Sequence, residues 1–310
     1  MKGVLLVNMG GAKSSKELKT FLLNMFRDPH ILPFGKFTRN LLSIIISNVR
    51  YKKSWIKYDM IGGSPIIDAT TQTMLALQKK LGANFSVKIA FSYSSPFINQ
   101  SLESFISESI NEVTVIPLYP QASFTTTSSV EHDVYDAALK TSGIKIHFIK
   151  EFYQREGFVN FWTSLISEHT RKNDYSDPCL LFSAHSIPAF QVNKGDTYPQ
   201  AIESTARAIA DRSGCRYELA YQSGMSSGKW IGPDIKNSLK RLAEKDTDEI
   251  VIIPVSFVNE NLETLYDIDY EIIPYGRMEA GIEHISRVEI PVVHPIFIDL
   301  LAEIAQEYTD

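Results

Sequence analysis

The chain has 310 residues, of which 44% are hydrophobic and 22% charged, and its formal net charge is −5. These values are typical of a globular protein of about two domains, and the acidic balance disfavours nucleic acid as a partner. The two cysteines, Cys179 and Cys215, make neither a paired thiolate motif nor the four ligands of an iron–sulfur cluster or a closed zinc site.

The start of the chain has the pattern of a buried strand and not of a leader sequence. Residues 1–8 contain no apolar segment followed by a small-residue cleavage site. No run elsewhere approaches the ~18 apolar residues that a membrane-spanning helix needs. We therefore expect a cytoplasmic protein.

Residues 29–58 differ from the rest of this acidic chain because they contain no Asp or Glu. The apolar run 41–46 lies among the basic side chains Lys36, Arg39, Arg50, Lys52, Lys53 and Lys57. This combination is typical of a lip that touches the inner face of a membrane, or of a pocket for an anionic amphiphile. A buried helix with a basic outer face explains it as well, because amphipathic helices occur in every kind of fold.

Short apolar runs rich in β-branched residues alternate along the chain with longer segments of helical period, which predicts parallel sheets covered by helices. Strands are predicted near 4–9, 87–93, 113–118, 144–149, 179–184, 217–221, 250–257 and 288–293. Helices are predicted near 15–26, 37–58, 69–81, 130–139, 156–171, 199–211, 233–244, 261–270 and 297–308. The pattern predicts two similar α/β domains, 1–154 and 155–296, with a cleft in a wide interface and a C-terminal helix, 297–310, packing back on the first.

In such sheets, ligand sites lie where the strands end. The first strand ends in Asn8-Met9-Gly10-Gly11, which lacks the third glycine of a dinucleotide fingerprint, so nucleotide binding is disfavoured. The third strand continues through Tyr119 into a run of hydroxyl side chains at 123–129. Capping explains one or two of these hydroxyls, and the others are suited to donate to an anionic group at the helix N-terminus.

The second half carries titratable groups at the corresponding places. His185 leaves an apolar strand between small residues and is placed either for proton transfer or as a satisfied structural histidine. Glu260, Glu263, Asp267 and Glu271 recur at intervals of three or four, which predicts one acidic line on a 3.6-residue helix. That line handles protons or metal, or it is a solvated helix face.

Eight motifs in this order resemble the ferrochelatase family, which inserts ferrous iron into a porphyrin. Their residues are 5–11, 24–29, 62–65, 117–121, 182–188, 194–199, 230–233 and 263–269. The most specific are Phe182-Ser-Ala-His-Ser-Ile-Pro188 and Glu263-Thr-Leu-Tyr-Asp-Ile-Asp269. The resemblance implies the chelatase fold of two Rossmann-like domains, with the active-site cleft between them.

The resemblance also implies roles for single residues. His185 is the proton acceptor from the pyrrole nitrogens or a metal ligand, Glu263 is the facing carboxylate, and Asp267 continues a path for metal or protons. The implied porphyrin contacts are Met9, Tyr93, Tyr119, Trp230 and Phe257 as walls, Arg50, Lys53 and Ser223 at the propionates, and Ser64 in a pocket loop. Porphyrin, most simply protoporphyrin IX, and Fe²⁺ are the implied substrates, with no permanently bound cofactor and no iron–sulfur cluster.

The chain departs from the family pattern at several positions. Ser92 stands at an arginine position, Glu260-Asn261 replaces an Asp-His pair, and residues 224–227 replace a Lys-x-Gly-Pro motif. Ser128 stands at a glycine position, and one glycine of the loop before Ser64 is missing. Two alternatives therefore stay open: a chelatase for sirohydrochlorin or cobalt, and a porphyrin or heme carrier that has lost catalysis.

Overall fold

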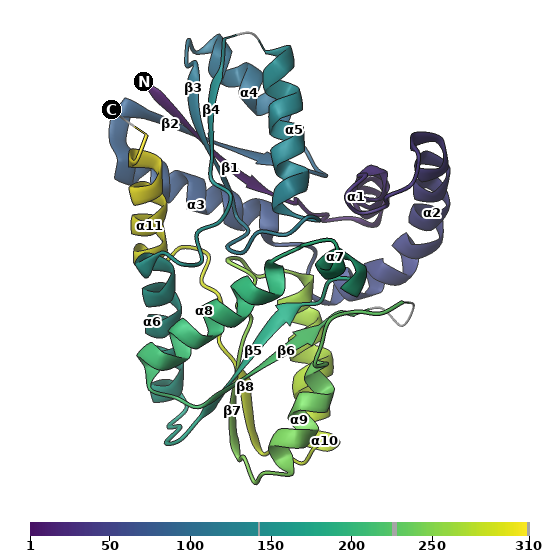
Figure 1. The fold of residues 1–310 in the computed structure, drawn as a ribbon, viewed down its shortest axis with the longest axis vertical. Coiled ribbons are helices and arrows are strands. Elements are labelled where there is room, and N and C mark those ends of the chain that lie inside the picture. The colour runs from purple at the N-terminus through teal and green to yellow at the C-terminus, as the bar shows by residue number, and fades with distance from the viewer. Residues whose placement is uncertain (142, 225–227, 309–310) are drawn as a thin grey trace. The chain divides into compact units, whose positions relative to one another are not determined.

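The computed structural model describes residues 1–141, 143–224 and 228–308 (Figure 1). The chain divides into two compact units. Unit 1 comprises Met1–Glu151 and Val292–Asp310, and unit 2 comprises Phe152–Pro291. The division follows residue 151, where the sequence pattern placed it after residue 154, and the C-terminal segment is part of unit 1.

Unit 1 contains a four-stranded parallel sheet in the order β2-β1-β3-β4. Its strands are β1 (Lys2–Asn8), β2 (Phe85–Phe91), β3 (Glu112–Pro117) and β4 (Lys145–Phe148). Strand β1 is buried from its second residue onward, as expected for a central strand covered on both faces. The short 3₁₀ turn η1 (Gly82–Asn84) leads into β2.

Helices cover both faces of this sheet (Figure 1). Helix α4 (Ile98–Ser107) and helix α5 (Thr127–Lys140) pack on one face, where Leu5, Val115, Leu102 and Val134 belong to one buried cluster. Helix α3 (Ile66–Leu81) packs on β1 and β2, and α11 (Pro295–Gln306) packs on α3. Lys80 and Asp299 form an ion pair of 2.6 Å between these two helices.

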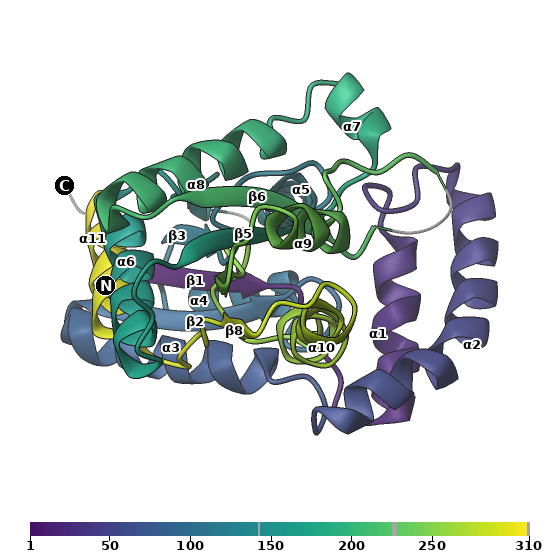
Figure 2. The same cartoon turned by 90° about the horizontal axis from the view of Figure 1, so that it is seen from below.

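Two helices of unit 1 lie outside the layered sheet. Helix α1 (Ser15–Arg27) is capped by Ser14, which accepts a hydrogen bond from the backbone of Glu17, and α2 (Lys36–Met60) runs beside it (Figure 2). Ser43 and Ser47 are the buried residues of α2, while most of its large apolar side chains are half-exposed or exposed.

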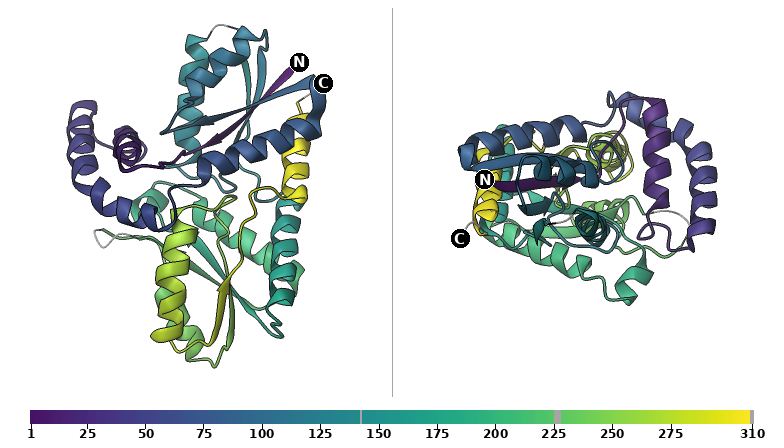
Figure 3. Two further views of the ribbon diagram at one scale, coloured as in Figure 1. Left: turned by 180° about the vertical axis from the view of Figure 1, so that it is seen from behind. Right: turned by 90° about the horizontal axis from the view of Figure 1, so that it is seen from above.

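Unit 2 repeats the architecture with the sheet order β6-β5-β7-β8, again parallel. Its strands are β5 (Cys179–His185), β6 (Tyr217–Gln222), β7 (Glu249–Ile253) and β8 (His284–Arg287). Figure 3 shows α6 (Glu156–Lys172) and α8 (Tyr198–Ser213) on one face, and α9 (Ile235–Ala243) with α10 (Ile273–Met278) on the other. The short helix α7 (Ala189–Asn193) follows β5.

The structure corrects the predicted elements at several places. The last strand is His284–Arg287 and not 288–293, because β7 pairs with residues 284–287 while the more apolar residues that follow lead out of the sheet. Helices α4, α7 and α10 had not been predicted. The segment predicted as an α-helix over 261–270 is a π-helix, η2, spanning Glu263–Ile272.

Candidate functional site

His185 lies at the carboxyl end of the central strand β5. Its backbone N–H donates to Ser256 Oγ at 3.2 Å, which ties the strand end to the segment after β7. Burial lowers the pKa of the imidazole below its ordinary value, and the nearby charge of Asp267 offsets part of that shift. A lowered pKa leaves the ring neutral at physiological pH, so it is able to accept a proton.

The end of β6 holds the π-helix in place beside this histidine. Gln222 is paired with His185 in the sheet register, accepts from Ser183 Oγ at 2.6 Å and donates to the Glu263 carbonyl at 3.2 Å. Ser223, predicted to hold a propionate, has a φ of +62° and donates through its Oγ to Asp267 Oδ2 at 3.1 Å. Gln222 was not predicted as a site residue, although a polar amide at the end of an apolar strand was a usable signal.

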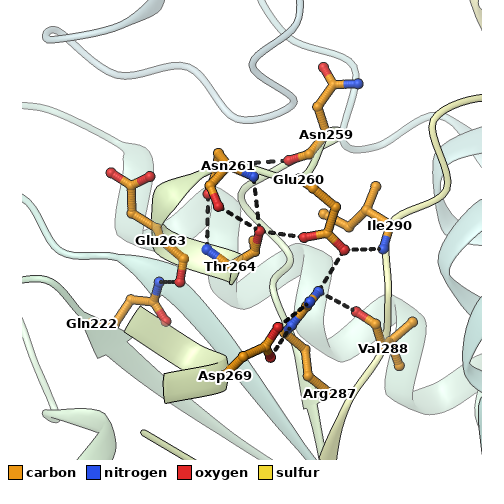
Figure 4. Close-up of polar contacts among 10 residues, drawn as sticks. All are labelled: Gln222, Asn259, Glu260, Asn261, Glu263, Thr264, Asp269, Arg287, Val288 and Ile290. Atoms are coloured by element: carbon orange, nitrogen blue, oxygen red, sulfur yellow. Dashed lines mark hydrogen bonds and ion pairs between the residues drawn. The ribbon is translucent and has the colours of Figure 1, made fainter. Parts of the chain in front are cut away.

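The π-helix η2 changes the predicted acidic line. Its hydrogen bonds reach one residue further than those of an α-helix, so each turn is wider. Glu263, Asp267 and Glu271 lie within η2 at intervals of four, whereas Glu260 precedes the helix and is not part of its acidic face. Figure 4 shows the Glu260 carboxylate turned to Arg287, while the Glu263 carboxylate points away from that arginine.

Aromatic side chains of unit 2 lie near the same strand ends. Trp230 forms a β-bridge with Pro188, three residues after His185, and Ile231 N–H donates to the Ile187 carbonyl at 3.0 Å. Trp230 and Phe257 are both partly buried. Residues 224–227 replace a motif of the family, and 225–227 of these lie outside the described part of the chain.

In unit 1, Met9 and Tyr93 meet in one apolar cluster. Met9 follows β1 and packs with Tyr93 against residues of α1, including Phe21. The Tyr93 hydroxyl donates to the buried carboxylate of Asp28 at 2.7 Å. Burial, and then the negative charge of Asp28, raises the pKa of Tyr93 well above its ordinary value.

Some hydroxyls of the run 123–129, which extends into the first turn of α5, make hydrogen bonds within the chain itself. Ser129 donates to the same Asp28 carboxylate that Tyr93 contacts, and Ser123 lies 3.3 Å from the Thr125 hydroxyl. The cap residue of α5, Thr126, makes no side-chain capping bond. Tyr119, which precedes the run, is partly buried, and burial raises the pKa of its hydroxyl above the ordinary value.

The remaining predicted contacts of unit 1 fall into two kinds. Arg50 and Lys53 are exposed on α2, and the Arg50 guanidinium lies 5.9 Å from the centre of the Phe26 ring. Ser64 is buried against Gly11, where an added Cβ would collide with the Ser64 side chain. Gly11 is therefore required for the close approach of these two loops.

Among the described residues, no three His, Cys, Asp or Glu side chains gather in an arrangement that could hold a metal ion, so His185, Glu263 and Asp267 are not a preassembled three-ligand set there. No helix in this part of the chain is long and apolar enough to cross a membrane.

Comparison with known proteins gives a family for the chain. The chain is 36% identical to a ferrochelatase of Aquifex aeolicus over 98% of both chains, and 35% identical to one of Gloeothece citriformis over 97% of this chain and 81% of that protein. Its fold is similar to that of SirB from Bacillus subtilis, with a TM-score of 0.63 and 10% identity over 99% of this chain and 95% of the other. CbiX, the terminal enzyme of siroheme biosynthesis in denitrifying bacteria, has the same fold with a TM-score of 0.55 and 14% identity over 99% of both chains. The profile of the ferrochelatase family matches residues 1–309, and the chain belongs to that family.

Proposed function

We propose that this chain is a chelatase of heme synthesis that inserts Fe²⁺ into protoporphyrin IX and releases two protons. The observation that carries the proposal is the pairing in unit 2 of a neutral strand-end histidine with the carboxylate helix η2, in a chain of the ferrochelatase family. Metal insertion needs a base for the pyrrole protons and weak ligands for the metal, and unit 2 offers both.

His185 acts in this proposal as the proton acceptor. The two pyrrole N–H bonds break, their electron pairs remain on the nitrogens, and Fe²⁺ takes the place of the two protons. Glu263 and Asp267 pass on protons or bind the metal in transit. Imidazole and carboxylate suit ferrous iron.

Each unit, taken by itself, offers side chains that suit a flat apolar macrocycle with carboxylates. Met9, Tyr93, Tyr119, Trp230 and Phe257 offer apolar and aromatic surface, to which flat ligands bind well. Arg50 and Lys53 are exposed cations suited to the propionates, with Ser223 and Ser64 as further polar contacts. No permanently bound cofactor is needed in this scheme, because iron is a substrate.

An anaerobic absorption assay tests the function. Ferrous iron is added to protoporphyrin IX, to coproporphyrin or to sirohydrochlorin, with and without the protein, and metalation is followed by the change in the visible spectrum. We expect enzyme-dependent metalation that is fastest with protoporphyrin IX. Preference for sirohydrochlorin would replace the proposal by the other chelatase activity, and tight porphyrin binding without metalation would make the protein a carrier.

We also propose that α2 touches the surface of an anionic membrane. Phe37, Leu41, Ile44 and Ile45 recur at intervals of one to four residues and are exposed on this helix, which also carries the exposed basic side chain of Lys36 directly before Phe37. Apolar side chains that enter the headgroup region beside cations are typical of interfacial helices. A cytoplasmic protein at the inner membrane face agrees with this placement.

Vesicle sedimentation tests the membrane contact with a matched control. Phe37 is 85% exposed on α2, and Leu139 is 86% exposed on α5, outside that apolar row. We expect binding to phosphatidylglycerol vesicles that is lost at high salt and in Phe37→Asp, but kept in Leu139→Asp. Equal binding to neutral vesicles, or an equal loss in both variants, would refute the contact.

A further inference from the structure

A buried arginine joins the π-helix to the edge strand of unit 2. Arg287 ends β8, and 4% of its side chain is exposed. Its Nε and Nη2 donate to the two carboxylate oxygens of Asp269 at 2.8 Å each, and its Nη1 donates to Glu260 Oε1 at 2.7 Å (Figure 4). One planar guanidinium therefore holds two carboxylates in a fixed geometry.

Glu260 connects Arg287 to two further groups, one after β8 and one in η2. Its Oε1 also accepts the Ile290 N–H at 2.8 Å, and its Oε2 accepts the Thr264 hydroxyl. Thr264 and Asn261 are joined twice, by Asn261 N–H to Thr264 Oγ1 at 2.9 Å and by Thr264 N–H to Asn261 Oδ1 at 3.0 Å. The first turn of η2 is thus tied to the segment that follows β8.

Along the sequence, the two carboxylates bound to Arg287 lie on either side of the two that are proposed to act on the substrate. Glu260 precedes Glu263 by three residues, and Asp269 follows Asp267 by two. Because both ends of this stretch are attached to one buried guanidinium, a change in the winding of η2 would alter their separation and break a charged contact. The other side of η2 is held by Gln222 at the Glu263 carbonyl and by Ser223 at Asp267.

The acidic residues therefore divide into two sets. Glu260 and Asp269 are bound to Arg287 and are structural, whereas the Glu263 carboxylate points away from that arginine and Asp267 accepts from Ser223. We propose that Arg287 is a positioning residue that sets where Glu263 and Asp267 stand by bracing η2 on both sides of them. The kinetic part of this inference rests on the proposed iron insertion.

Arg287→Lys tests the brace because lysine keeps the charge but cannot form the planar fork. The matched control is Arg241→Lys in the same unit, where a 48% exposed arginine donates to Glu218 at 3.0 Å. We expect Arg287→Lys to lower kcat about 10- to 100-fold, as loss of a group that orients ligands usually does, with the Kd for porphyrin unchanged. Arg241→Lys should retain wild-type kinetics. Unchanged kcat in Arg287→Lys would overturn the proposal.

A variant in which all three charges of the network are removed distinguishes a positioning role of Arg287 from a purely stabilising one. Arg287→Met alone leaves two carboxylates without their cation, whereas Arg287→Met with Glu260→Gln and Asp269→Asn removes all three charges together. We expect the triple variant to recover the melting temperature lost by Arg287→Met, but not its kcat. Recovery of both would show that Arg287 only stabilises the fold.

Hydrogen exchange gives a measurement that needs no activity. In Arg287→Lys, the amides of residues 263–268 should exchange faster than in the wild type, while those of β5 stay protected as before. Unchanged exchange in 263–268 would refute the brace. If the wild-type protein inserts no iron, the proposed function fails, and the exchange experiment still decides whether Arg287 holds η2.

Discussion

The two units have the same sheet topology but carry different chemistry at the ends of equivalent strands. In unit 1 the central strand β1 is followed directly by Met9, and in unit 2 the central strand β5 ends at His185. After the next strand of each sheet, β3 is followed by the hydroxyl-rich start of α5, and β7 is followed by the acidic helix η2. The fold thus supplies two similar scaffolds, and their side chains decide which unit offers apolar surface and hydroxyls and which offers titratable groups.

The units also solve the burial of a carboxylate in different ways. In unit 1, the donors to Asp28 are neutral: the Tyr93 and Ser129 hydroxyls and the backbone N–H of His30. In unit 2, Glu260 faces the charged Arg287. A neutral hydrogen bond is worth less than a buried charged one, and loss of a cation leaves its partners uncompensated. The network of unit 2 should therefore tolerate substitution less well.

The largest expected effect is the difference in kinetics between substitutions at the proposed catalytic groups of unit 2 and a substitution at Met9 of unit 1. His185→Ala and Glu263→Gln should each lower kcat by about 10²- to 10⁴-fold, the usual contribution of a positioned acid or base, without unfolding the protein. Met9→Ala should act mainly on KM for porphyrin, by about tenfold for the lost apolar contact. Steady-state kinetics and circular dichroism check both statements. A kcat loss in Met9→Ala as large as in His185→Ala would abolish the distinction between the units.

The next effect compares two arginines of unit 2. Arg287→Met should lower the free energy of unfolding by about 3 kcal/mol, the lower end of the range for a broken buried pair, because Glu260 and Asp269 lose a buried partner but are themselves only partly buried. Arg241→Met, at an exposed pair, should cost less than ~1 kcal/mol. Urea unfolding followed by circular dichroism measures both. Equal losses would mean that Arg287 is no more important to the fold than a surface ion pair.

Much of the fold could be predicted because buried parallel strands leave a strong local pattern. The runs at β1 and β5 are almost wholly apolar, so their ends, and with them Met9 and His185, could be placed from the sequence. The last strand could not, since residues 288–293 are more apolar than His284–Arg287, and only pairing with β7 selects the latter.

The site was predicted less completely because its geometry depends on contacts distant in sequence. The apolar spacing of η2 fits an α-helix as well as a π-helix. The segment is held by Arg287 through Glu260, just before η2, and by Gln222 through the Glu263 carbonyl, and both partners are distant in sequence. Nothing near Glu260 in the sequence indicates that its partner lies 27 residues later. The roles of His185 and Glu263 remain predictions of the family resemblance.

A smaller effect is expected at the carboxylate of unit 1. Tyr93→Phe removes one neutral donor from the buried Asp28 and should lower the free energy of unfolding by about 1–3 kcal/mol, the range for a buried acceptor that loses a partner. The Ser129 hydroxyl and the His30 amide remain. Thermal and urea unfolding of this variant, next to Arg287→Met, compare the two ways of burying a carboxylate. A loss in Tyr93→Phe larger than in Arg287→Met would reverse the comparison.

The smallest expected effect is a shift in the acid limb of the pH–rate profile. His185 must be neutral to accept a proton, and burial lowers its pKa, so activity should persist below the ordinary histidine value of about 6.5. Asp267 raises that pKa, hence Asp267→Asn should move the limb to still lower pH, whatever it does to the maximal rate. Glu271→Gln, one turn further along η2, is the control and should leave the limb in place. Tyr93 and Tyr119 of unit 1 have raised pKa values and do not titrate in this range. A shift of the limb to higher pH in Asp267→Asn would mean that a group other than His185 limits the reaction in acid.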